Sequence, residues 1–179
     1  MSSSTERLIL GIDPGYATTG YGVVAVTGQK LLAVDYGVIR TSADQRFSER
    51  VLAIYEGVRT LLERFRPGEV ALEELFFARN TTTALGTAQA RGVCLLAAEQ
   101  AGLMLLEYTP AQVKMSVTGN GRAEKVQVQE MVRLLLNLKE IPRPDDAADA
   151  LAVAICQAHI GNELGREIFG GYQNRRRDM

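Results

Sequence analysis

The chain has 179 residues, a length that suits one folded domain with a substantial apolar core. Its 20 Lys and Arg residues nearly balance 21 Asp and Glu residues, and the net charge of −1 does not by itself indicate a nucleic-acid-binding protein. No apolar run approaches the roughly 20 residues that cross a bilayer, and residues 1–5 lack the profile of a signal peptide, so we expect a cytoplasmic protein without membrane contact.

The few histidine and cysteine residues argue against several kinds of catalytic or metal site. His159 is the only histidine in the sequence, which argues against a zinc site and against a Ser-His-Asp apparatus. Cys94 and Cys156 lie in apolar stretches, where we expect core thiols and no disulfide between them.

The first predicted element is a short apolar run, Leu8 to Ile12, that leads directly into Asp13. Its apolar residues are nearly continuous, which is typical of a strand buried on both faces of an α/β sheet. Pro14 and Gly15 then turn the chain. Because Asp before Pro-Gly is a good turn former, this stretch taken alone favours a purely local role for Asp13.

The remaining elements alternate in a way that indicates one α/β domain. Strands are predicted over residues 20–27, 31–40, 69–75 and 103–108, and helices over 46–65, 83–101, 110–118, 123–138 and 144–160. The strand–helix–strand connection through 46–65 implies a parallel neighbour and a right-handed crossover. We therefore expect a single domain over residues 1–179, with a folded core at about 7–161 and a flexible, Arg-rich tail at 162–179.

Carboxylates stand at the ends of these elements. If the strand at 69–75 lies beside the first strand, Glu73 or Glu74 arrives near Asp13. Asp146 and Asp149 are three residues apart, so they share one face of the last helix.

A structural role explains only some of these acids. Asp145 and Asp146 fall in a helix's first turn, where acids oppose the helix dipole. That role does not cover Asp149, which precedes the apolar run ALAVAI. Converging carboxylates repel one another, and a divalent cation such as Mg²⁺ or Mn²⁺ removes that cost. Two such ions about 4 Å apart activate water in phosphodiester hydrolysis, so the acids together favour a metal-dependent nuclease.

Local charge is compatible with a DNA partner. No acid occurs in residues 75–98 or 108–123, and a phosphate backbone needs a local positive surface rather than a basic protein. A solvent-exposed surface without any DNA partner could have the same distribution of charged residues. Gly15, Gly20 and Gly22 would let a phosphate approach closely, although turn geometry explains them as well.

The motifs GIDPG, TGYGV, ALEELFFARN, QARGV, AEKVQVQEMV and DDAADALAVA follow one another between about Leu8 and His159. In this order and spacing they resemble the RuvC family of bacterial Holliday-junction resolvases. The resemblance implies an RNase H-like fold with a five-stranded mixed sheet flanked by helices. It further implies a homodimer that makes paired symmetric nicks across a four-way DNA junction, with Mg²⁺ or Mn²⁺, two ions per active site. A branch-migration motor of the RuvA/RuvB type is the implied protein partner.

The resemblance also assigns the catalytic acids. It implies that the catalytic residues, which are also the metal ligands, are Asp13, Glu73, Asp146 and Asp149. Glu74 and Asp145 stand next to two of these positions, and spacing alone does not exclude either of them.

Residues for DNA contact follow from the same resemblance. Phe76 would stack on bases or wedge between them with Phe77 beside it, whereas aromatic burial alone would place both rings in the core. Lys114 and Lys125 match lysines near the scissile phosphate, against the alternative of two solvated helix lysines. The implied DNA-binding residues are Phe76, Phe77, Arg79, Arg91, Lys114 and Lys125.

Three other functions remain open. A nuclease of the same fold that acts on RNA or on other branched DNA would keep the acids and differ in substrate. An actin-like kinase or ATPase also uses a GID-x-G turn, but such chains are normally longer and carry a second phosphate loop. A junction-binding module without catalysis is expected to have lost one of the acids, and all four are present here.

Overall fold

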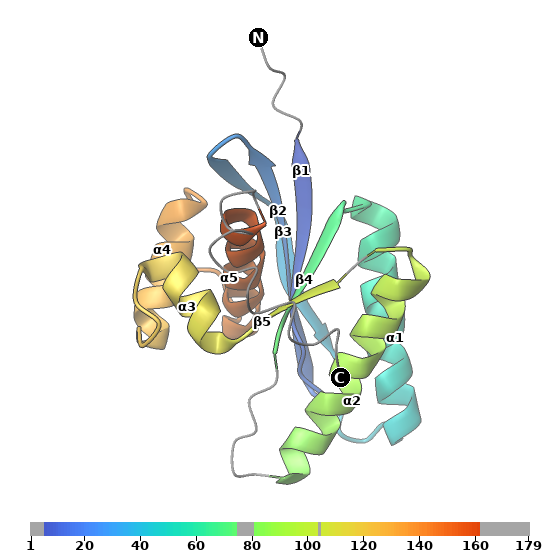
Figure 1. The fold of residues 1–179 in the computed structure, drawn as a ribbon. Coiled ribbons are helices and arrows are strands. Elements are labelled where there is room, and N and C mark those ends of the chain that lie inside the picture. The colour runs from blue at the N-terminus through green and yellow to red at the C-terminus, as the bar shows by residue number, and fades with distance from the viewer. Residues whose placement is uncertain (1–5, 75–80, 104, 162–179) are drawn as a thin grey trace, which may run out of the picture.

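The structure is a computed structural model that describes residues 6–74, 81–103 and 105–161. A five-stranded sheet separates two layers of helices, with α1 and α2 on one face and α3, α4 and α5 on the other (Figure 1). The elements are β1 (Arg7–Asp13), β2 (Thr18–Thr27), β3 (Lys30–Arg40), α1 (Phe47–Phe65), β4 (Glu69–Glu73), α2 (Thr81–Gln100), β5 (Leu105–Tyr108), α3 (Pro110–Thr118), α4 (Lys125–Leu135) and α5 (Asp145–Ile160). The predicted order of elements is confirmed. Within the described ranges, no helix combines the length and the apolar character that a membrane span requires.

The sheet is mixed, with the strand order β3-β2-β1-β4-β5. β1 pairs antiparallel with β2 and parallel with β4, and β4 pairs parallel with β5. The inferred placement of the fourth strand beside the first is therefore confirmed, whereas β3, which α1 connects to β4, is not a neighbour of β4 in the sheet. The C-terminal ends of β1 and β4 and the N-terminus of α5 meet at one edge of the sheet, the lower edge in Figure 1.

Several element ends have local causes in the sequence. Arg66 takes a left-handed conformation (φ 47°) that closes α1 immediately before Pro67. Thr109 caps α3 by accepting a hydrogen bond from the backbone N–H of Gln112, as expected of a cap residue before Pro110. α4 is shorter than the predicted helix over 123–138 because the chain turns out of helical geometry after Leu135.

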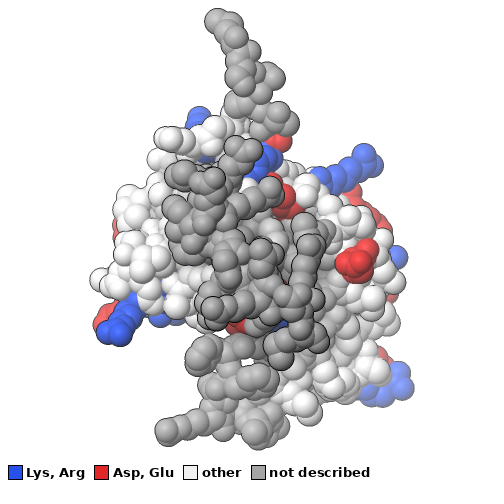
Figure 2. Space-filling model, in the orientation of Figure 1, with Lys and Arg blue, Asp and Glu red and all other residues white. Residues whose placement is uncertain are grey.

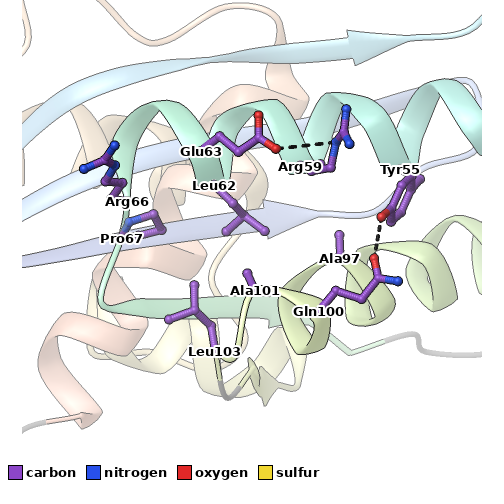
Figure 3. Close-up of a pocket in the computed structure, with 10 residues that line it drawn as sticks. All are labelled: Tyr55, Arg59, Leu62, Glu63, Arg66, Pro67, Ala97, Gln100, Ala101 and Leu103. Carbon is purple, nitrogen blue, oxygen red and sulfur yellow. Dashed lines mark hydrogen bonds and ion pairs between the residues drawn. The ribbon is translucent and has the colours of Figure 1, made fainter.

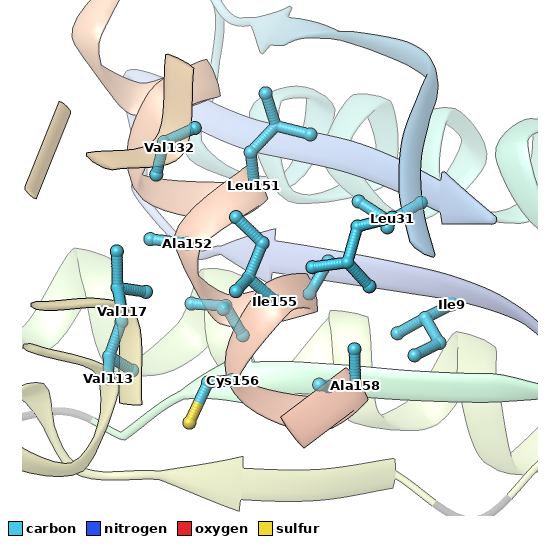
Figure 4. Close-up of a cluster of buried hydrophobic side chains, with 14 of the residues drawn as sticks. Ile9, Leu31, Val113, Val117, Val132, Leu151, Ala152, Ile155, Cys156 and Ala158 are labelled. Carbon is cyan, nitrogen blue, oxygen red and sulfur yellow. The ribbon is translucent and has the colours of Figure 1, made fainter. Parts of the chain in front are cut away.

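The apolar core has two parts, one on each face of the sheet. The part on the α5 side is drawn in Figure 4, where Leu151, Ile155 and Ala158 of α5 lie among residues of the strands and of α3 and α4. α5 is buried along nearly its whole length. Cys94 and Cys156 are free and buried in opposite parts of the core, which confirms the expectation of two core thiols.

Glycines in β1 and β2 allow α5 to lie directly on the sheet. A β-carbon on Gly11 would lie 2.6 Å from the backbone nitrogen of Ala154, and one on Gly22 would lie 2.7 Å from the Leu151 Cδ2 atom. A β-carbon on Gly20 would contact the backbone carbonyl of Asp146. The expectation that Gly20 and Gly22 make room for a phosphate is therefore wrong, because helix α5 fills that space.

Candidate active site

The alternation of side chains along the strands points Asp13 and Glu73 toward α5. Ile9 of β1 and Ala71 of β4 pack in the core on the α5 side of the sheet. Successive side chains on a strand alternate between faces, so Asp13, four residues after Ile9, and Glu73, two after Ala71, lie on that same face. The parallel register sets Ile12 beside Leu72, so the two carboxylates leave neighbouring strands at the same level.

Helix α5 brings two more carboxylates to this place. Gly20 is paired with Asp13, and the Cβ atom of Asp146 lies 3.2 Å from the position that a β-carbon on Gly20 would take. Asp149 follows one turn later on the same side of α5 as Asp146. Three elements of the fold thus contribute acids to one corner of the molecule.

The electrostatics of the acids indicate that they interact. Burial, together with the negative charges of Glu73, Asp149 and Asp146, raises the pKa of Asp13 to about 8 against the opposing charge of Lys125. Burial and the charge of Asp149 raise the pKa of Glu73 to about 7. Burial also raises the pKa of Asp149, although Lys125 opposes that change. Such shifts arise where carboxylates crowd together in a partly desolvated site.

Tertiary structure separates the acids that spacing left equivalent. Asp146 lies against β2, whereas Asp145 is turned toward Arg143 and Lys125. Glu73 is the last residue of β4 on the α5 face, and Glu74 follows the strand and donates its backbone N–H to the Tyr108 carbonyl at 2.7 Å. This arrangement supports Glu73 and Asp146 as the members of the acidic group.

Two lysines influence the same group, one of them by direct contact. Lys125 of α4 donates to the Asp149 Oδ2 atom at 2.9 Å, and its Nζ atom lies 3.5 Å from Asp145 Oδ2. Burial lowers the pKa of Lys125, but the hydrogen bond and the charge of Asp149 outweigh that effect and raise it. The charge of Lys114 on α3 opposes the rise in the pKa of Glu73.

The donor chemistry of the group fits a divalent cation. Its ligand atoms would all be carboxylate oxygens, the set that suits Mg²⁺ or Mn²⁺. Within the described parts of the chain, no three Asp, Glu, His or Cys side chains already stand close enough to share one ion. Like charges repel in the absence of a cation, and the Lys125 ammonium on Asp149 supplies the positive charge that balances part of the group.

Local contacts support the turn that follows Asp13. The buried Thr19 hydroxyl donates to the Gly15 carbonyl at 2.7 Å and closes the turn. The Tyr16 ring stacks on Phe47 with centroids 5.2 Å apart, and the Arg50 guanidinium lies 3.7 Å from the Tyr16 centroid. These contacts anchor the chain directly after the carboxyl end of β1.

The structure adds little support for the other predicted DNA-binding residues. Phe76, Phe77 and Arg79 lie outside the described residues, as does the predicted tail at 162–179. Arg91 of α2 pairs with Glu107 of β5, with an Nε–Oε1 distance of 2.9 Å, so its charge is already balanced within the fold. The face drawn in Figure 2 shows Lys and Arg atoms at several separate places, with acidic atoms among them.

The acids do not line either of two surface hollows found elsewhere in the fold. One, of about 370 Å³, lies between α1 and α2 and is lined by residues that include Tyr55, Leu62 and Leu103 (Figure 3). The other, of about 460 Å³, is lined by residues of α3, α4 and the segment between them. The acidic group instead lies where the strands end, the edge at which α/β sheets commonly bind ligands.

Comparison with known proteins identifies the family. The profile described as crossover junction endodeoxyribonuclease RuvC matches residues 9–157. The chain is 57% identical over 159 residues to the crossover junction endodeoxyribonuclease RuvC of Desulfitobacterium hafniense strain Y51, covering 89% of this chain and 96% of that protein. It is 54% identical over 158 residues to the same enzyme of Rubrobacter xylanophilus, covering 88% of each chain.

Solved structures agree with the sequence comparison. Thermus thermophilus RuvC in complex with Holliday junction substrate is 42% identical and superposes with a TM-score of 0.84, covering 89% of this chain and 97% of that one. The yeast mitochondrial Holliday junction resolvase Ydc2 is 17% identical with a TM-score of 0.66 over 96% of this chain and 84% of its own, which shows a shared RNase H-like fold. The chain belongs to the RuvC family of crossover junction endodeoxyribonucleases.

Proposed function

We propose that this chain is an endonuclease that resolves four-way DNA junctions by paired, symmetric nicks. The observation that carries the proposal is the convergence of acids from β1, β4 and α5 at one sheet edge, in a chain of the RuvC family. The proposed catalytic residues and metal ligands are Asp13, Glu73, Asp146 and Asp149.

The acids and the lysines have different proposed roles: the acids bind metal ions, and the lysines bind the reacting phosphate. Mg²⁺ or Mn²⁺, as two ions held by the carboxylates, would supply an activated water and stabilise charge on the leaving oxygen. Lys125 pairs with Asp149, and the charge of Lys114 acts on Glu73. Both lysines would bind phosphate oxygens and offset charge that grows during the reaction. The raised pKa values of Asp13 and Glu73 are consistent with carboxylates that gain when positive charge arrives.

A four-way junction presents two equivalent strands, which suits a two-fold symmetric enzyme. We propose that the chain acts as a homodimer of one domain per subunit, in the cytoplasm and together with a branch-migration motor of the RuvA/RuvB type. Phe76, Phe77, Arg79 and Arg91 are retained as proposed DNA contacts. Sedimentation at working concentration is expected to give a dimer, and a monomer that still makes paired nicks would contradict the symmetric arrangement.

Cleavage of a synthetic four-way junction in Mg²⁺ tests the proposed chemistry. Asp13→Asn is expected to abolish cleavage and to leave junction binding nearly intact, because the change removes a negative ligand and keeps the shape of the side chain. Cleavage by this variant at the wild-type rate would refute the assignment. A parallel panel of linear duplex, forked DNA and RNA separates junction resolution from a broader nuclease activity.

Phe76→Ala tests the proposed wedge. Loss of a ring that stacks on opened bases is expected to slow junction cutting more than it weakens binding to plain duplex. Equal effects on both would refute the wedge. Nucleotide hydrolysis measured in the same preparation would detect an actin-like ATPase, for which we expect no signal above the buffer.

A further inference from the structure

A group of charged side chains adjoins the acids without belonging to them. Asp145, the first residue of α5, accepts from the Arg143 Nη1 atom on its Oδ1 oxygen. Its other oxygen lies 3.5 Å from the Lys125 Nζ atom. The same ammonium lies 2.9 Å from Asp149, so Lys125 connects this group to the acidic centre.

Stability alone does not account for this arrangement. The Arg143 side chain is 66% exposed and that of Lys125 is 53% exposed, and ion pairs in such positions contribute little to the free energy of folding. Beneath them, Gln129 is 4% exposed and its Nε2 atom has no hydrogen-bond partner within the described residues. That amide faces Asp145 from α4, one turn beyond Lys125. Asp145 is thus a fixed carboxylate surrounded by donors.

The charge balance leaves this group positive once Asp149 binds a metal ion. Arg143 and Lys125 share the carboxylate of Asp145, and Lys125 also pairs with Asp149. When a cation takes up the charge of Asp149, the remaining three side chains together carry a net charge of +1. Both cations reach solvent beside the acids proposed to hold the metal. A backbone phosphate carries one negative charge, and a guanidinium binds phosphate oxygens through two parallel N–H donors. The charge and the donor geometry therefore fit one phosphate of a DNA strand.

We propose that Arg143 binds a DNA backbone phosphate that neighbours the scissile one, that Lys125 lies beside it, and that Asp145 is the positioning residue that holds both cations in place. The inference rests on the proposed function, since it requires a DNA strand at the acidic centre. It adds Arg143 to the predicted DNA-binding residues and gives Asp145 a role other than metal ligation.

The salt dependence of junction binding tests Arg143. In an Asp13→Asn background, where cleavage does not interfere, Arg143→Ala is expected to weaken junction binding and to reduce the slope of log K against log salt by about 0.9, the value for one phosphate contact. Arg143→Lys keeps the charge and is expected to retain the slope with part of the affinity. A wild-type slope in Arg143→Ala would overturn the proposal.

Arg64→Ala provides a matched control. The Arg64 side chain is 67% exposed and also pairs with an acid, Asp35, at 3.5 Å, but it lies at the C-terminal end of α1 on the other face of the sheet. Its removal is expected to leave the slope unchanged. An equal fall in slope for both variants would overturn the proposal, because the effect would then follow general charge.

The positioning role of Asp145 needs a kinetic measurement. Asp145→Ala is expected to lower the single-turnover cleavage rate several-fold at saturating enzyme without reducing the salt slope, because both cations remain but are no longer held together. Asp145 also lies in a helix's first turn, so thermal unfolding is measured alongside. A wild-type rate, or a rate loss no larger than the loss of folded protein, would overturn this role. A wild-type chain that neither binds nor cuts junctions would refute the proposed function itself. Normal cutting by the wild type, with an unchanged salt slope of junction binding in Arg143→Ala, would reject the phosphate site alone.

Discussion

Replacing Asp13 by Asn is expected to stabilise the metal-free protein at neutral pH. Asp13 lies in a crowded, partly desolvated group of acids, and its pKa rises from 3.8 to about 8 on folding. A carboxyl whose folded pKa is raised favours the folded state only while it is protonated. Its contribution is therefore fully present below about pH 4 and is lost as pH rises through the interval from 3.8 to about 8.

The size of the effect follows from the shift. At pH 7 the unfolded chain ionises Asp13 fully while the folded chain keeps it mostly protonated, a difference of about three pKa units that corresponds to about 4 kcal/mol. Asn has nearly the same shape and no charge, so the variant avoids this cost. For a chain of this size the gain corresponds to a rise in Tm of about 8–16 °C.

Urea unfolding in EDTA at pH 4, 7 and 8.5 measures the gain. We expect a small difference between variant and wild type at pH 4 and a large one at pH 7 and above. Asp145→Asn is the matched control, because burial raises the pKa of Asp145 but the charges of Lys125 and Arg143 outweigh this and lower it. That variant is expected to lose stability as pH rises. A gain in Asp13→Asn that is independent of pH would refute the electrostatic reasoning.

Three further predictions concern metal binding and packing. Mg²⁺ at 100 times its dissociation constant is expected to stabilise the wild type by about 2.7 kcal/mol and Asp13→Asn by much less. Equal shifts in the Tm of the two proteins would contradict a metal site that includes Asp13. Gly22→Ala is expected to lower the free energy of unfolding in urea by about 1–3 kcal/mol, because the new β-carbon would lie 2.7 Å from the Leu151 Cδ2 atom. Gly68→Ala is the control: a β-carbon there would have no atom within 4 Å, so we expect a far smaller loss. Tyr108→Phe removes the buried hydrogen bond from the hydroxyl to the Gln157 carbonyl oxygen and is expected to cost about 1 kcal/mol, and a neutral result would show that this bond contributes no net stability.

Much of the fold was predictable from local patterns. The apolar run before Asp13, the helical periodicity over 46–65 and the cap at Thr109 each depend on neighbouring residues alone, and the structure confirms each element. Topology rules allowed the parallel placement of the fourth strand beside the first without requiring it, and the structure confirms that placement. Element ends were less predictable: α4 ends at Leu135, where Asn137 takes a left-handed conformation (φ 53°) and the Leu138 N–H donates back to the Arg133 carbonyl at 2.9 Å.

The candidate site was predictable as a set of residues but not as an arrangement. Spacing alone did not distinguish Glu73 from Glu74, or Asp146 from Asp145, because adjacent residues are equally close in sequence. The face of β4 and the packing of α5 on β2 separate them in space. The roles of Gly20 and Gly22 were mistaken for a related reason, since the partner that fills their space comes from a helix more than 120 residues later.

The local patterns of the sequence thus established the elements, their order and the chemical types of the site residues, because these depend on contacts within a few positions of the chain. Only the tertiary structure decided which acids share one environment, how strongly they perturb one another, and that Asp145 is turned toward Arg143 and Lys125. The physical reason is that burial and charge act through space: they depend on how β1, β4, α4 and α5 pack together, and no local pattern encodes that distance.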